Sequence, residues 1–150
     1  MATFAPIVEK TAVSLLSLQK GDGAEQLEDC SFRHRFVGCQ EEINETWDFV
    51  ETAAMIANCD LVITCDTAVA HLAAEMGKPT WVLLVAVPDW RWGMKRDTTF
   101  WYPSMRVFRQ RERGNGQEVM DRAPRSLERI SWPCTEGGSH TDSCGFRGTD

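Results

Sequence analysis

Residues 60–79 carry the sequence DLVITCDTAVAHLAAEMGKP, and this stretch decides the fold. Within it, residues 61–64 form a continuous apolar, β-rich run of the kind that parallel sheets bury on both faces. Asp66 or Thr67 then caps a helix at the carboxyl end of that strand. Such a helix directs free N–H groups and the positive end of its dipole outward, so the segment predicts an anion-binding site. His71 lies four residues after Thr67 and shares its helix face.

A purely structural interpretation accounts for the same residues. Strand, turn and helix units are common in α/β proteins, and no glycine-rich phosphate fingerprint is present here. Asp66 and Thr67 would then be ordinary helix caps, and His71 a partly buried histidine. The residues alone leave both interpretations open.

The composition predicts one water-soluble domain. The chain has 150 residues, of which 43% are hydrophobic, and this is enough for a single core. Its 22 acidic and 16 basic residues give a net charge of −6, so no basic field attracts nucleic acid or an anionic membrane surface. The longest apolar run, residues 81–87, is far shorter than the roughly 20 residues that cross a bilayer. Without a signal-peptide pattern, we expect a cytoplasmic protein that binds neither nucleic acid nor membrane.

The six cysteines do not indicate a metal centre. None belongs to a Cys-x-x-Cys pair, and Cys59 and Cys65 flank the predicted buried strand like small core residues. Cys30, His34 and Cys39 offer at most three ligands, with arginines between them and no second pair. We expect reduced thiols, no metal and no other cofactor.

Short strands and helices alternate along the chain. Strands are predicted at residues 12–18, 36–38, 61–64, 80–86 and 105–109, and helices at residues 24–29, 47–58, from Asp66 or Thr67 to Gly77, and at 115–129. This alternation predicts a parallel α/β sheet with right-handed crossovers. Residues 88–103 interrupt it as a loop rich in tryptophan and charge. Residues 1–130 are expected to form the domain, and residues 131–150, rich in Gly, Ser and Thr, a disordered tail.

Five motifs in register carry a resemblance to a known family. They are residues 17–21 (SLQKG), 48–56 (DFVETAAMI), 60–79, 88–92 (PDWRW) and 101–103 (WYP). In this order they resemble the C-terminal half of family 9 glycosyltransferases, a group that includes heptosyltransferases and the glycosyltransferase domains attached to tetratricopeptide repeats. The resemblance implies a GT-B architecture, in which two Rossmann-like domains face each other across a cleft. It therefore implies a Rossmann-like parallel sheet with helices on both faces.

The resemblance also implies a binding site. Asp66, Thr67, Ala68 and His71 correspond to the family's Asp-Thr/Ser-Gly/Ala-x-x-His signature, which holds the diphosphate of a nucleotide-sugar donor. Backbone N–H groups near Thr67 and Ala68, the Thr67 hydroxyl and the His71 ring suit phosphate oxygens without a metal. The small Ala68 side chain lets the diphosphate approach the backbone.

Two further segments are candidates for donor or acceptor contacts. Lys20 follows a predicted strand and suits a base or ribose edge, or else is a solvated turn lysine. The loop of Trp90, Arg91 and Trp92 offers aromatic faces for a ring and a guanidinium for a phosphate. The alternative is that these tryptophans cover the end of the sheet, and both interpretations stay open.

The same resemblance implies that part of the enzyme is missing. A full member needs an N-terminal domain that binds the acceptor and supplies the general base, and a chain of this length has no room for it. The match also begins after the first strand of the C-terminal domain, which is therefore incomplete and leaves a sheet edge open. We expect that edge to be covered by a loop, by residues 1–10, or by another chain, either a second copy in a homodimer or a separate N-terminal half.

Three functions compete on this basis. The first is a nucleotide-sugar-binding domain, the donor half of a glycosyltransferase and not catalytic alone. The second is a truncated, stand-alone remnant that self-associates or binds proteins while its phosphate site is idle. The third, a small hydrolase or phosphatase using His71 and Asp66, is disfavoured because no nucleophile or metal cluster lies at a recognisable spacing.

Overall fold

A parallel sheet organises the domain. The computed structural model describes residues 4–9, 11–45 and 47–127, without the side chains of residues 124–126. In these ranges the sheet consists of β1 (Val62–Cys65), β2 (Thr80–Leu84) and β3 (Met105–Arg109), in that order and all parallel. The predicted boundary at residue 130 and the predicted tail lie outside the described residues.

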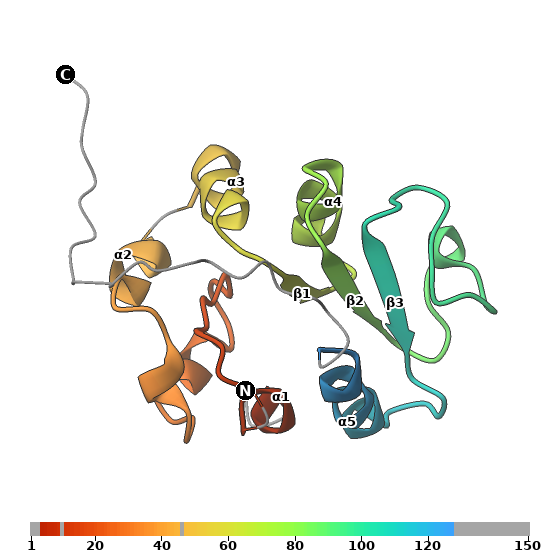
Figure 1. The fold of residues 1–150 in the computed structure, drawn as a ribbon, viewed down its shortest axis with the longest axis horizontal. Helices are drawn as coiled ribbons and strands as arrows, with labels where there is room; N and C mark the ends of the chain where they lie inside the picture. Colours follow the sequence, from red (N-terminus) through yellow and green to blue (C-terminus); the bar gives the residue numbers. More distant parts are fainter. Residues whose placement is uncertain (1–3, 10, 46, 128–150) are drawn as a thin grey trace.

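Helices cover both faces of this sheet, as expected for an α/β Rossmann-like fold (Figure 1). On one face lie α3 (Phe49–Ala57) and α4 (Ala68–Glu75), and on the other lie α1 (Ala5–Glu9) and α5 (Gly116–Leu127). The helix α2 (Gln40–Glu45) precedes α3 along the chain. In the part of the chain that the structure describes, no helix combines the length and apolarity needed to cross a membrane.

The central strand β2 shows why helices cover both faces of the sheet. Trp81 faces α5 and packs against Phe108 of β3, with ring centroids 4.8 Å apart. Its neighbours Val82 and Leu84 point the other way, into the cluster that contains Ala70 of α4. Because side chains alternate along a strand, a run that is apolar at every position must bury both of its faces.

The helix α4 packs closely because its inner face is made of alanine. Ala70, Ala73 and Ala74 are at most 6% exposed. The helix ends at Glu75, two residues before the predicted end, and Met76 is its C-cap. Gly77 follows with a positive φ of 72°, which allows the chain to reverse after the last turn. This packing places the first turn of α4 directly after the end of β1.

Two of the predicted strands do not form. Residues 12–18 and 36–38 share only an isolated parallel bridge between Leu15 and Phe36. Side chains take the place of a ladder: Arg35 donates to the carbonyl oxygens of Thr11 and Val13, and the Gln40 amide bonds both the N–H and the C=O of Ser17. Together with the two backbone hydrogen bonds of Leu15, to Arg35 and Val37, these contacts join one side of the segment to residues 35–40 without a regular ladder.

The first strand of the sheet is less buried than predicted. In β1 only Val62 is buried, and Cys65 is exposed rather than a core residue. The reason is position: β1 lies at one end of the described sheet and pairs with β2 alone. Leu18, from the segment at residues 12–18, packs against a cluster that contains Ile56 and Val62.

Smaller differences concern lengths and omissions. The strand predicted to reach residue 86 ends at Leu84, and the helix predicted at residues 24–29 is a short 3-10 turn at Ala24–Leu27. The helices α1 and α2 were not predicted, because each has only one or two buried apolar residues and thus no measurable period.

The different burial of two cysteines predicts different reactivity. Burial raises the pKa of the Cys59 thiol, and its Sγ donates to the Met55 carbonyl oxygen at 3.4 Å. Cys65 is exposed. Because the thiolate is the reactive form, iodoacetamide should modify Cys65 several-fold faster than Cys59 at pH 8. Peptide mapping by mass spectrometry measures both rates in one sample, and equal rates would contradict the placement of Cys59.

Candidate functional site

Loops at the ends of two neighbouring strands form the candidate site. β1 leads into Asp66 and Thr67, and α4 begins at Ala68. β2 leads, through residues 85–89, into a 3-10 turn at Trp90–Trp92. Since β1 and β2 are parallel and paired, their carboxyl ends meet at the same edge of the sheet, where α/β proteins bind ligands.

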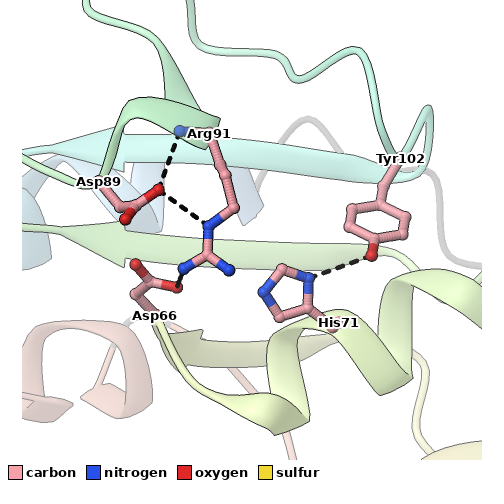
Figure 2. A network of polar contacts seen from close by, with 5 residues as sticks. All are labelled: Asp66, His71, Asp89, Arg91 and Tyr102. Atoms are coloured by element: carbon pink, nitrogen blue, oxygen red, sulfur yellow. Dashed lines mark hydrogen bonds and ion pairs between the residues drawn. The ribbon is translucent and has the colours of Figure 1, made fainter.

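An aspartate and an arginine shape the second loop (Figure 2). Asp89 Oδ1 accepts hydrogen bonds from the Arg91 backbone N–H at 3.0 Å and from Arg91 Nε at 2.9 Å. The backbone bond, reinforced by the Arg91 side chain, holds the pKa of Asp89 below its usual value. Asp66 Oδ1 lies 3.9 Å from Arg91 Nη2, an ion-pair distance too long for a hydrogen bond. The guanidinium is therefore fixed through Nε, while its other N–H groups keep capacity for a ligand.

The ring of His71 is fixed by two aromatic neighbours. It stacks on Trp92, with centroids 5.4 Å apart and planes 25° apart, and its Nδ1 lies 3.1 Å from the Tyr102 hydroxyl. Figure 2 shows the other ring nitrogen on the side of the Arg91 guanidinium. The histidine from α4 and the arginine from the second loop thus face a common space.

The tryptophans of the second loop have different environments. Trp92 is 2% exposed and packs in the cluster of α4, β2 and β3. Its Nε1 is buried and finds no hydrogen-bond partner within the described part of the chain. Trp90 is 78% exposed. Covering the sheet therefore describes Trp92, while Trp90 remains accessible to a ligand.

No side chain in the described ranges caps the start of α4. Thr67 occupies the N-cap position in extended conformation, but its hydroxyl lies 3.2 Å from the Thr64 hydroxyl and does not cap the helix. Ala68 is exposed. The first N–H groups of a helix generally lack intrahelical partners, and in α4 the Ala70 N–H is already used, since it donates to the Thr67 carbonyl oxygen at 3.0 Å. The N–H groups before it are the ones that suit an anion.

Lys20 is placed differently. Its ammonium donates to the carbonyl oxygen of Ile43 in α2, and burial lowers the pKa of this lysine. Lys20 is therefore not part of the polar network that Figure 2 shows. Within the described ranges, no three or more His, Cys, Asp or Glu side chains are arranged to hold a metal ion.

Sequence reasoning missed two members of this group, Asp89 and Tyr102. Asp89 had a local signal, because an aspartate two residues before Arg91 is typical of a turn in which the carboxylate accepts the later backbone N–H. Tyr102 lies in the motif at residues 101–103, but nothing in that motif predicts its contact with His71, which spans 31 positions of the chain.

Comparisons with known proteins agree with the fold. Residues 9–117 match the model of glycosyltransferase family 9 (heptosyltransferase). Protein FlbA of Caulobacter vibrioides is 30% identical over 126 residues, which cover 81% of this chain and 20% of FlbA. The chain thus spans about a fifth of the length of that relative. No solved structure matches. The match to the family model covers most of the chain, which therefore belongs to glycosyltransferase family 9.

Proposed function

We propose that this domain binds the diphosphate of a nucleotide-sugar donor at the start of α4. The ligand would lie among Thr67, His71 and Arg91, with Ala68 allowing close approach to the backbone. In this proposal the chain is the donor half of a GT-B glycosyltransferase and is not catalytic alone. The acceptor and the general base would belong to a second domain, and the nucleotide-sugar requirement favours a cytoplasmic location.

One observation carries this proposal. Hydrogen-bond donors from the start of α4 and from the loop after β2 lie close together, and within the described residues not all of them are used in hydrogen bonds. The uncapped first turn of α4 supplies backbone N–H groups and a helix dipole. His71 and Arg91 face the same space from either side (Figure 2). A guanidinium matches phosphate oxygens in pairs, which makes Arg91 the strongest single donor of the group.

The charges in the site explain why an arginine is required there. Asp66 and Asp89 both lie beside Arg91, and each carries the same sign of charge as a diphosphate. Both carboxylates contact the guanidinium on one side, so their charge is partly compensated before a ligand arrives. We infer that Asp66 contributes by orienting Arg91, and not by touching phosphate oxygens.

The proposal predicts that loss of the Thr67 hydroxyl or of the His71 ring weakens nucleotide binding. The full chain is titrated by calorimetry with ADP, UDP, GDP and their sugar conjugates at low salt. His71→Ala and Thr67→Ala should each lower the affinity about tenfold, since each removes one hydrogen bond to a charged group. His34→Ala is the matched control, because His34 is exposed in the distant turn Arg33–Arg35 and should have no effect.

Two results would count against the assignment. If the His71 and His34 variants bind equally well, the site lies elsewhere. If the unmodified chain binds none of these nucleotides at millimolar concentration, the alternative gains support, namely a remnant that self-associates or binds proteins while its phosphate site is idle.

A further inference from the structure

The two nitrogens of the His71 ring have different surroundings. Nδ1 lies 3.1 Å from the Tyr102 hydroxyl, and the Tyr102 ring meets the imidazole edge-on, with centroids 5.7 Å apart. The ring face stacks on the buried Trp92. Among the residues that the structure describes, Nε2 has no such partner, and it points toward the side of Arg91 (Figure 2). Only one of the two nitrogens therefore faces the space proposed for the ligand.

The hydroxyl of Tyr102 determines whether Nε2 of His71 is a hydrogen-bond donor or an acceptor. A neutral imidazole carries one proton, and the hydrogen bond at one nitrogen fixes the role of the other. A phenol is a better donor than acceptor, because its oxygen lone pairs are delocalised into the ring, whereas an unprotonated imidazole nitrogen is a strong acceptor. The favoured arrangement is thus Tyr102 O–H donating to Nδ1, which leaves the proton of His71 on Nε2.

We propose that Tyr102 is a positioning residue, which holds His71 in the Nε2–H tautomer and so presents a donor to the phosphate oxygens. This inference rests on the proposed function. In the opposite tautomer Nε2 would direct a lone pair at a negatively charged oxygen, and the contact would be repulsive. Tyr102 touches no ligand in this arrangement and acts through His71 alone.

Arg91 does not engage Nε2 of His71, although the guanidinium lies on that side of the ring (Figure 2). Between these two described side chains no hydrogen bond forms, and Arg91 Nε instead donates to Asp89. Two donors that face one space without bonding each other are the arrangement that an anion completes.

The tautomer can be measured without any nucleotide. The full chain, labelled with ¹⁵N, has three histidines, and ¹H–¹⁵N multiple-bond spectra separate the protonated from the unprotonated ring nitrogen of each. The His71 signals are those lost in His71→Ala. At an alkaline pH where the ring signals no longer move, we expect an unprotonated Nδ1 and a protonated Nε2. A protonated Nδ1 in the unmodified chain would overturn the proposal.

The variant Tyr102→Phe removes the hydroxyl and keeps the aromatic ring. In it the two His71 nitrogen shifts should move toward each other, as expected for a ring that exchanges between tautomers, while the His34 shifts stay unchanged. ADP affinity should fall about two- to tenfold, the effect of one ordinary hydrogen bond. Unchanged His71 shifts would overturn the inference. If the variant fails to fold, the spectrum of the unmodified chain decides alone.

Failure of this inference and failure of the proposed function give different results. If the unmodified chain binds ADP while Tyr102→Phe keeps the same tautomer and affinity, Tyr102 has no positioning role but the binding site stands. If the unmodified chain binds no nucleotide, the proposed function fails. The spectra then still show whether Tyr102 controls the protonation of His71.

Discussion

Replacing Arg91 with alanine should weaken nucleoside diphosphate binding about 30- to 100-fold, the largest binding effect that this site allows. A guanidinium donates two parallel hydrogen bonds to phosphate oxygens and brings a full positive charge. Its removal also leaves the carboxylates of Asp66 and Asp89 uncompensated beside the ligand. Calorimetric titration with ADP or UDP at low salt measures the loss.

Two further variants separate charge from geometry and from general effects. Arg91→Lys keeps the charge but loses the paired donors, so it should recover only part of the affinity. Arg33→Ala is the matched control, because Arg33 is also an exposed arginine in a 3-10 turn, paired there with Glu28. Wild-type affinity in Arg91→Ala would mean that Arg91 serves only its own turn.

Trp81→Ala should cause the largest loss of stability, about 3–5 kcal/mol in the free energy of unfolding. Trp81 is 4% exposed and lies in the cluster that joins α1 and α5 to the sheet. Truncation removes its tilted ring contact with Phe108 and leaves a cavity between β2 and α5. Such a loss approaches the entire stability of many domains of this size. Urea denaturation followed by far-UV circular dichroism measures it.

Trp90→Ala is the natural comparison, because the same residue type is 78% exposed there. Its unfolding free energy should stay within about 0.5 kcal/mol of the unmodified chain. Comparable losses in the two variants would show that Trp81 does not point into the core, and the pairing of β2 with its neighbours would then need revision.

The elements with the clearest sequence signals are the ones that formed. The continuous apolar run of β2 is buried by helices on both sides, and α3 begins after Asp48, whose side chain accepts the Glu51 N–H at 2.8 Å. Residues 12–18 show the opposite case. Their β-rich composition describes an extended chain correctly, but whether that chain pairs with a strand depends on Arg35 and Gln40, more than twenty positions later.

The candidate site also contains residues that the sequence predicts and residues that only the fold brings together. The parts adjacent in sequence, from Asp66 to His71, were predictable because strand, cap and helix follow one another. Arg91 was a candidate because its loop is rich in tryptophan and charge. Its place beside Asp66 follows from the fold, in which the parallel strands β1 and β2 end at the same edge of the sheet. The partner of His71 at Nδ1 required the folded chain, since no local pattern relates a helix to a residue 31 positions away.

The isolated bridge at Leu15 has a dynamic consequence. Segments 11–17 and 35–40 are fastened mainly by two side chains, Arg35 and Gln40, and not by a ladder of amides. A ladder unzips from its ends one bond at a time, whereas a few side-chain contacts release together. We therefore expect these segments to open as a separate unit, with amides that exchange with solvent through fluctuations that leave β2 and β3 intact.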